Sequence, residues 1–400
     1  MCGIAGFTTF RKAPENASTV IRNMAATLTA RGPDGEGYFS DTSINLGHKR
    51  LSIIDIEGGA QPMSIENGRF QITYNGEVYN YLELKADLEK KGVSFASKSD
   101  TEVILQQFAA DGTNCLASLN GMFAFAIWDA REKQLFLARD RIGIKPLYYS
   151  LIDGDIYFAS ELKALLAHPF IPREIDHLAL SKYLTYAYVP APHTIFENIF
   201  KLEPGAFIVF SEKGFHKDSY WDIPIQDNPL SDKTFDEYQE EIITLLQDSV
   251  EKRLRSDVPV GVLLSGGVDS STITALAAKA ASGTLHTFSI GFEESSYDES
   301  PFARQVSELY NTKHHHKILS SSAAAQIFPE AMKILDEPFA DPSILPTYLL
   351  SQYCAEHVKV VLGGDGGDEL FVGYASFQAH KLMERLSILP SRWRDKLISF

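Results

Sequence analysis

Hydrophobic and polar positions follow different patterns in the two halves of the chain. Up to about residue 210, short apolar runs alternate with turn residues, as in Phe70–Tyr74 and Ile156–Ala159. Runs of this length, rich in aromatic and branched residues, predict β-strands. Helices are predicted between them over Tyr81–Lys91 and over Thr101–Ala110, the latter with Asp100 as its N-cap. The first half is therefore predicted to be an α+β domain.

The second half alternates continuous apolar runs with helical segments. Apolar runs that lack polar alternation are typical of strands buried on both faces of a parallel sheet. Their alternation with helices predicts a doubly wound α/β fold, in which ligands bind beyond the carboxyl ends of the strands. The predicted strands are Val258–Leu264, Leu285–Ile290 and Val358–Leu362, and the predicted helices cover residues 270–281, 299–310 and 322–335.

A polar, proline-containing stretch separates the two halves. Residues 211–233 are predicted to be a linker between a first domain, residues 1–210, and a second domain, residues 234–400. The second domain opens with a predicted amphipathic helix over Phe235–Leu254. Its apolar side is predicted to carry Ile242, Leu245, Leu246 and Val250.

Charge and cysteine content exclude several classes of protein. The chain has 37 Lys and Arg against 52 Asp and Glu, a net charge of −15, which argues against nonspecific binding of nucleic acid or anionic membranes. Three cysteines are too few for a disulfide framework and indicate a reducing compartment, the cytoplasm. No apolar run is long enough to span a membrane, and the N-terminus has no signal-peptide pattern.

A glycine-rich loop joins the first predicted strand of the second half to a helix. Its sequence runs from Ser265 to Ser271 and contains Gly266, Gly267 and Asp269. Glycines let a backbone approach a phosphate, and the helix N-terminus supplies unpaired N–H donors. A carboxylate would repel phosphate directly, so the aspartate suits a Mg²⁺ bridge. A structural turn with a serine cap is the alternative. The loop matches neither a Walker A nor a dinucleotide-binding motif.

A second glycine-rich loop, Gly363–Glu369, follows the third predicted strand. It carries four glycines and three acids, which could hold another face of Mg²⁺–pyrophosphate. A flexible surface turn with solvated acids is the alternative. Because both loops end strands of one parallel sheet, the phosphate role is the favoured interpretation.

The N-terminus carries a candidate nucleophile. Removal of Met1 would expose Cys2 with a free α-amine, which can act as a general base toward its own thiol. Such a nucleophile needs an oxyanion hole, and Asn75-Gly76 after a β run offers an amide side chain and a backbone N–H. Taken alone, an Asn-Gly pair is more typical of a hairpin turn, and a cysteine at position 2 is usually without function.

Five ordered motifs in the first half resemble the class II glutamine amidotransferase domain. With the two glycine-rich loops, the chain resembles the glutamine-hydrolysing asparagine synthetase family from residue 2 to about 374. The motifs of the first half are Cys2–Gly6, Arg31–Gly35, His48–Asp55, Tyr74–Asn80 and Ser99–Glu102. The resemblance implies an N-terminal-nucleophile αββα sandwich followed by an ATP-pyrophosphatase domain.

The resemblance also implies site residues in the first domain. Cys2 corresponds to the nucleophile, and Asn75 with Gly76 to the oxyanion hole. Residues that correspond to glutamine-binding positions are Arg50, for the carboxylate, and Glu77 and Asp100, for the α-ammonium.

In the second domain, the resemblance implies binding of ATP and Mg²⁺. Asp269 and Asp368 correspond to Mg²⁺ ligands. The ATP-binding positions are Ser265, Gly266, Gly267, Asp269, Ser270, Ser271, Ile290, Gly291, Gly363 and Gly364. ATP would adenylate a carboxylate, and ammonia from glutamine would reach the acyl-adenylate through a tunnel.

Two departures from the family leave the acceptor open. The second loop differs from the Ser-Gly-Glu-Gly type, and the acceptor segment Asp336–Pro346 contains no basic residue to pair with a small dicarboxylate. Aspartate is the first candidate acceptor, and another carboxylate, such as a sugar acid, is the second. A non-catalytic regulatory or binding protein that retains the fold is a third hypothesis, which is disfavoured by the intact Cys2, Arg50, Asn75 and Asp100.

The family usually continues for 100 or more residues and includes a lysine that no residue here matches. We therefore expect the sequence to be a fragment in its second domain. The resemblance is compatible with a homodimer. His314–His316 and the cysteines Cys115 and Cys354 are interpreted as structural rather than as metal ligands.

Overall fold

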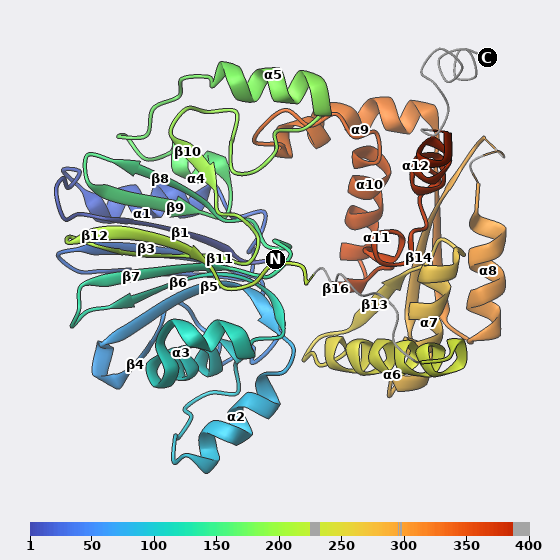
Figure 1. The fold of residues 1–400 in the computed structure, drawn as a ribbon, viewed down its shortest axis with the longest axis horizontal. Coiled ribbons are helices and arrows are strands. Elements are labelled where there is room, and N and C mark those ends of the chain that lie inside the picture. Colours follow the sequence, from blue (N-terminus) through green and yellow to red (C-terminus); the bar gives the residue numbers. More distant parts are fainter. Residues whose placement is uncertain (225–232, 295, 297, 387–400) are drawn as a thin grey trace. The chain divides into compact units, whose positions relative to one another are not determined.

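The computed structural model describes residues 1–224, 233–294, 296 and 298–386. The chain forms two compact units (Figure 1). The first contains Met1–Glu240, Arg255–Pro259 and Ser322–Leu349, and the second contains Glu241–Leu254, Val260–Ser321 and the residues from Leu350 onward. A segment late in the sequence thus folds with the first unit.

Two six-stranded sheets make up the centre of the first unit. The first sheet has the order β10 (Ile199–Lys201), β8 (Tyr148–Ile152), β9 (Asp155–Ala159), β1 (Gly3–Thr8), β3 (Ile44–Arg50) and β2 (Gly35–Ser40). The second has the order β12 (Gly214–Ser219), β11 (Ala206–Ser211), β7 (Gln134–Arg139), β6 (Gly121–Asp129), β5 (Phe70–Val78) and β4 (Met63–Ile65).

Alternation along the strands builds a four-layer sandwich. In β1, Ala5 and Phe7 pack with Met24 of helix α1 (Ala17–Ala26), whereas Ile4 points into the core between the sheets, which also contains Trp128. Successive strand residues point to opposite faces, so a strand buried on both sides serves two cores. The second sheet is covered by α2 (Tyr81–Lys90) and α3 (Asp100–Asp111) (Figure 1). This confirms the predicted αββα sandwich.

Further elements complete the first unit. They are the 3-10 helices η1 (Glu66–Gly68) and η2 (Gly112–Ser118), and the α-helices α4 (Leu162–Leu166), α5 (His177–Tyr186) and α9 (Ser321–Ile334). The chain crosses between the units inside α6 (Phe235–Arg253), twice in the segment that follows α6, after the first residue of α9, and inside α10 (Ile344–Ala355).

The second unit is built on a parallel sheet of order β15 (Lys313–Leu319), β14 (His286–Phe292), β13 (Val260–Leu263) and β16 (Val360–Leu362). Val262 of β13 packs with Ala277 of α7 (Val268–Ala280) and with Val250 of α6. Phe288 of β14 packs in a separate cluster with Cys354. Helices α8 (Ser300–Leu309), α11 (Gly367–Phe371) and α12 (Ala375–Leu386) complete it. The predicted parallel α/β sheet is confirmed.

Several local predictions need correction. The cap of α3 is Ser99, whose hydroxyl accepts from Thr101 N, so Asp100 is the first helical residue and not the cap. Residues Gly214–Ser219, in the range predicted as linker, form β12 and pair with β11, and residues 225–232 of that range lie outside the described part. On the predicted apolar side of α6, Val250 is buried but Leu245 is 63% exposed.

Candidate active sites

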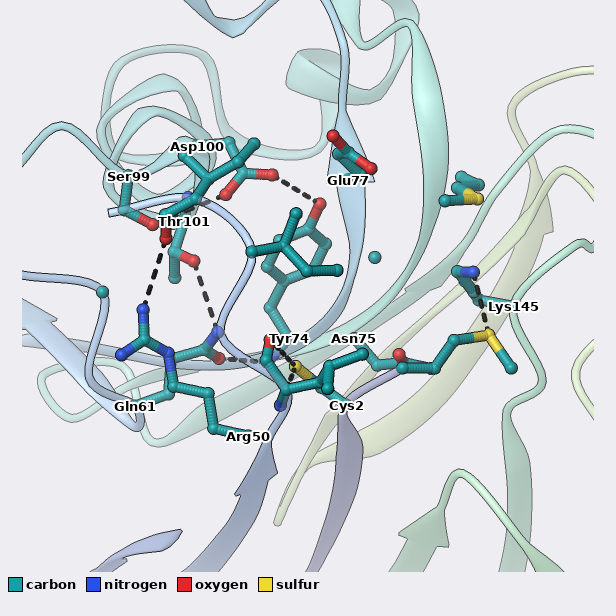
Figure 2. Close-up of a pocket in the computed structure, with 17 residues that line it drawn as sticks. Cys2, Arg50, Gln61, Tyr74, Asn75, Glu77, Ser99, Asp100, Thr101 and Lys145 are labelled. Atoms are coloured by element: carbon teal, nitrogen blue, oxygen red, sulfur yellow. Dashed lines mark hydrogen bonds between the residues drawn. The ribbon is translucent and has the colours of Figure 1, made fainter. Parts of the chain in front are cut away.

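A pocket in the first unit brings together all six residues predicted for glutamine chemistry (Figure 2). Cys2 precedes β1, Arg50 ends β3, and Asp100 begins α3. Asn75, Gly76 and Glu77 lie in succession on β5. The other lining residues are Met1, Leu51, Ile53, Ile54, Gly59, Gln61, Tyr74, Ser99, Thr101, Met122 and Lys145.

The Cys2 thiol lies beside the backbone of Leu51. Its Sγ is 3.7 Å from Leu51 O and 3.4 Å from Leu51 N. Burial raises the pKa of the thiol above its ordinary value. Burial also lowers the pKa of the adjacent Met1 amine to about 5. The Met1 amine is therefore neutral at pH 7, and the thiol needs a base to become a thiolate.

The Asn75 side chain is the least satisfied polar group of the pocket. It is fully buried, and neither Nδ2 nor Oδ1 has a hydrogen-bond partner among the described residues. An unpaired buried amide costs about 1–3 kcal/mol, so it is uncommon in a native protein. Contrary to the prediction, Asn75-Gly76 does not follow the strand but lies inside β5, paired with Ala124 and Phe123 of β6. The hairpin interpretation is therefore wrong.

Gly76 is required by its surroundings. A Cβ atom at this position would lie 2.2 Å from Met122 O and 2.7 Å from Phe123 Cα, so only glycine fits between β5 and β6. The missing side chain lets the Gly76 backbone and the Asn75 amide line the same pocket as the thiol.

Charged side chains line the end of the pocket away from Lys145, where Arg50 and Asp100 lie (Figure 2). The Arg50 guanidinium donates to Ile56 O and Asp55 O, each at 2.7 Å, which fixes its orientation. Asp100 accepts from the Tyr74 hydroxyl at 2.8 Å and from Val78 N at 3.0 Å, and burial raises the pKa of its carboxyl. A fixed guanidinium and buried acids can orient an amino acid by its carboxylate and ammonium groups.

Sequence reasoning missed some residues of this pocket. Gln61 accepts from Tyr74 N at 2.7 Å, which anchors the strand that carries Asn75. Lys145 lies on the side of Cys2 opposite Arg50 (Figure 2), and its Nζ is 3.0 Å from Met1 Sδ. Burial lowers the pKa of the Lys145 ammonium to about 8. No local pattern marks Lys145, because its contact with Met1 joins residues far apart in the sequence.

The first glycine-rich loop adopts the predicted strand-to-helix geometry. Gly267 caps α7 without a side-chain hydrogen bond. Gly266 has φ +91°, and a Cβ there would lie 2.5 Å from Ala303 N, so glycine is required. Ser265 Oγ lies 3.0 Å from Ser270 Oγ and accepts from Gly267 N at 3.2 Å. The Ser271 hydroxyl is buried without a partner among the described residues.

The second loop packs directly against the first. A Cβ on Gly364 would lie 3.0 Å from Asp269 Cβ and 3.1 Å from Ser270 N, and one on Gly367 would lie 2.4 Å from Asp269 Oδ2. Gly363 immediately follows β16. The two glycine loops therefore meet around Asp269, as their place at the strand ends predicted.

The remaining predicted nucleotide positions lie on β14. Ile290 and Gly291 are in register with Lys317 and Ile318 of β15, and a Cβ on Gly291 would lie 2.6 Å from the His316 ring. Among the described residues, no group of three or more His, Cys, Asp or Glu is arranged as a metal site. Mg²⁺ commonly uses one or two carboxylates plus phosphate oxygens, so Asp269 and Asp368 need no such cage.

The histidine tract is part of the sheet. His314 and His316 both reach the Ser289 hydroxyl, at 3.1 and 3.0 Å, whereas His315 stacks on Phe288 from the other face. Successive histidines therefore point to opposite faces of the sheet. Cys115 and Cys354 are free and buried, as predicted. None of the helices in the described part is both long and apolar enough to cross a membrane.

The two units together define a class of protein, in which an N-terminal-nucleophile sandwich is joined to a parallel sheet of the ATP-pyrophosphatase type. Residues 1–221 match the glutamine amidotransferase domain, and residues 241–398 match asparagine synthase. The chain therefore belongs to the family of glutamine-hydrolysing asparagine synthetases.

Similar sequences support this family assignment. The chain is 38% identical, over its whole length, to asparagine synthetase [glutamine-hydrolyzing] 1 of Bacillus subtilis, of which it spans 63%. It is 39% identical, over 98% of its length, to putative asparagine synthetase [glutamine-hydrolyzing] 2 of Methanocaldococcus jannaschii, of which it spans 79%. A solved structure, glutamine phosphoribosylpyrophosphate amidotransferase from B. subtilis, shows a remote likeness: 17% identity, TM-score 0.42, and coverage of 79% of this chain and 81% of that one.

Proposed function

We propose that the chain hydrolyses glutamine at Cys2 and delivers the ammonia to a carboxylate activated as an acyl-adenylate. The observation that carries this proposal is the unpaired, fully buried amide of Asn75 in the pocket of the Cys2 thiol. Such a donor is costly to the folded protein and useful only to a charge that appears there during a reaction.

In the first step, the α-amine of Cys2, free once Met1 is removed, takes the thiol proton. The thiolate attacks the side-chain carbonyl of glutamine, and the oxyanion is held by Asn75 Nδ2 and the Gly76 backbone N–H. The intermediate collapses to a thioester as the protonated α-amine returns its proton to the nitrogen, which leaves as ammonia. Water then hydrolyses the thioester to glutamate and frees the Cys2 thiol. Arg50 orients the carboxylate of glutamine, and Glu77 and Asp100 orient its ammonium group.

In the second unit, the loops around Asp269 would hold the phosphates of ATP. Ser265, Ser270 and Ser271 offer hydroxyls, and the start of α7 offers backbone N–H groups. Asp269 and Asp368 would hold Mg²⁺, which would neutralise charge on the pyrophosphate that leaves. Ile290 and Gly291 would contact adenine.

The acceptor is proposed to be aspartate, which would give asparagine, AMP and pyrophosphate. A different carboxylate remains the second candidate, because Asp336 and Glu337 of the acceptor segment pair with Lys163 and Lys201 and so consume the nearby positive charge. AMP release measured with glutamine, Mg²⁺-ATP and either aspartate or a uronic acid separates the two. Aspartate-dependent release supports asparagine synthesis, and release with the uronic acid alone overturns it.

Cys2→Ala tests the glutaminase half. The variant should lose glutamine hydrolysis while its thermal unfolding stays as in the wild type, because the thiol makes only weak contacts. Unchanged glutamine turnover would refute the proposal. The cytoplasm is the proposed location, and light scattering of the purified chain tests the homodimer that the family resemblance allows.

A further inference from the structure

A continuous line of charged contacts leads from the nucleophile to the acceptor segment. Arg31 Nε donates to Cys2 O at 2.9 Å, and Arg31 Nη1 donates to Glu161 Oε1 at 2.9 Å. Lys163 Nζ lies 2.8 Å from Glu161 Oε2 and 3.4 Å from Asp336 Oδ1. Lys163 N also donates to Asp336 Oδ2 at 3.1 Å. All of these residues belong to the first unit.

The link to Cys2 matters because the nucleophile lies at a chain end. Cys2 precedes β1, and chain ends fray unless something ties them down. Removal of Met1 would leave Cys2 as the terminal residue, next to Gly3, the first residue of β1 to pair with β3. The charge-assisted hydrogen bond from Arg31 then fixes the main chain of Cys2. The position of the Cys2 main chain sets the distance between the thiol and the glutamine carbonyl.

Glu161 fixes the direction in which Arg31 points. The Arg31 and Glu161 side chains are only 11% and 17% exposed, so their ion pair is little screened by water. Glu161 is itself held in place, because it is the N-cap residue of α4 and follows Ser160, which bonds to both Ile4 N and Ile4 O. Glu161 thus places Arg31 against the strand that carries Cys2.

Lys163 divides its charge between two acids. It pairs with Glu161 on one side and with Asp336 on the other, and the Asp336 side chain is 13% exposed. Lys163 holds the Glu161 carboxylate in place and Asp336 holds Lys163, so loss of the Asp336 contact loosens Glu161 and, with it, Arg31. Residue 336 lies in the part of the sequence that matches asparagine synthase, although it folds with the first unit.

We propose that Glu161 and Lys163 are positioning residues for glutamine hydrolysis, which hold Cys2 through Arg31 and make that hold depend on Asp336. This rests on the proposed glutaminase function of Cys2. The segment that carries the acceptor-side acids thereby influences the rate at which ammonia is produced.

A neighbouring ion pair provides a matched control. Lys201 pairs with Glu337, the residue next to Asp336, so it also holds the acceptor segment on the first unit. Lys201 Nζ further donates to Val189 O, and Glu337 accepts from Ile195 N. In the described part of the chain, neither Lys201 nor Glu337 forms a hydrogen bond or ion pair with Glu161 or Arg31, so Lys201→Met loosens the segment without touching the line to Cys2.

The experiment compares steady-state glutamine hydrolysis by Glu161→Gln, Lys163→Met, Lys163→Arg, Asp336→Asn and Lys201→Met in the full chain. Glu161→Gln and Lys163→Met should lower kcat about three- to thirtyfold, below the hundredfold loss that a 1 Å displacement can cause. The KM for glutamine should change less than about twofold, because Arg50 and Asp100 do not contact this line. Lys163→Arg should restore most of the rate, and Lys201→Met should keep the wild-type kcat.

Asp336→Asn removes the acidic partner of Lys163 instead of Lys163 itself. Asp336→Asn should also lower kcat. The double variant with Lys163→Met should show no further loss, because both substitutions remove the same ion pair between the Lys163 and Asp336 side chains. Equal losses in Lys163→Met and Lys201→Met would overturn the proposal, since docking of the segment alone would then matter. Wild-type kcat in Lys163→Met and Asp336→Asn would also overturn it. If Cys2→Ala keeps its turnover, the proposed function itself fails, which is a separate result.

Discussion

Replacement of Asn75 by leucine separates stability from catalysis, because the two should change in opposite directions. Leucine has nearly the shape of asparagine but no polar atoms. The Asn75 amide is fully buried and unpaired among the described residues. Removing a buried unsatisfied polar group recovers part of its penalty of about 1–3 kcal/mol. We therefore expect Asn75→Leu to unfold with a free energy up to about 2 kcal/mol higher than the wild type.

The same substitution should nearly abolish glutamine hydrolysis. Loss of one oxyanion donor typically lowers kcat by about 10²–10³, or about 2.7–4 kcal/mol of transition-state stabilisation. The KM for glutamine should change little, because Arg50, Glu77 and Asp100 are untouched. The assays are glutamate release at saturating glutamine and urea unfolding followed by tryptophan fluorescence, to which the buried Trp128 contributes.

Asn80→Leu is the control. Asn80 donates to Ser118 O and accepts from Asn120 N, each at 2.9 Å, and lies outside the pocket. Its replacement should lower stability by about 1–3 kcal/mol and leave kcat unchanged. If Asn75→Leu were instead destabilised and kept its kcat, the amide would be a structural group and the oxyanion assignment would be wrong.

Three further predictions concern other parts of the chain. Gly367→Ala places a Cβ 2.4 Å from Asp269 Oδ2 and should weaken Mg²⁺-ATP binding about tenfold in calorimetry. Gly283→Ala, whose Cβ would have no atom within 4 Å, should bind Mg²⁺-ATP normally, and equal affinities of the two variants would show that the contact between Gly367 and Asp269 does not matter for binding. Burial and neighbouring histidines lower the pKa of His315 to about 4, so between pH 6.5 and pH 4 the unfolded chain binds a proton that the folded chain does not. The free energy of unfolding should therefore decrease as the pH is lowered over this range. His315→Leu should flatten that dependence in urea titrations, and an unchanged slope would contradict the prediction. Met1 lines the glutamine pocket, so protein that mass spectrometry shows to retain it should not hydrolyse glutamine until aminopeptidase removes it; full turnover with Met1 in place would argue against the α-amine as base.

Much of the fold could be predicted from local pattern. Strands β13 and β16 are predictable because their apolar runs are unbroken, whereas β15, which begins with a lysine and three histidines, has no such run and was missed. Helix α2 ends within one residue of its prediction, because its polar and apolar positions repeat with helical period. The errors lie where tertiary context decides. Asn75-Gly76 has turn composition, yet pairing with β6 continues the strand through it. Periodicity puts Leu245 on the apolar side of α6 with Val250, but the structure buries Val250 and leaves Leu245 exposed.

The site was predictable only as far as motifs extend. Cys2, Arg50 and Asp100 stand in recognisable motifs, and the structure brings them to one pocket. Lys145 and Glu161 have no such signal, because their contacts with Met1 and Arg31 span more than a hundred residues. The acceptor segment appeared to lack basic partners for the same reason: Lys163 and Lys201 reach it from far earlier in the chain.

The extended backbone at Asn75-Gly76 also bears on the chemical lifetime of the protein. Asn-Gly is the dipeptide most prone to deamidation, in which the glycine nitrogen attacks the asparagine side chain and a cyclic imide forms. Ring closure requires a backbone turn that β5 does not permit, since both residues are paired with β6 and both are buried or nearly so. The strand that presents the amide to the pocket therefore also protects it from conversion to aspartate. Local opening of β5 would end that protection and place a negative charge where the proposed reaction needs a donor.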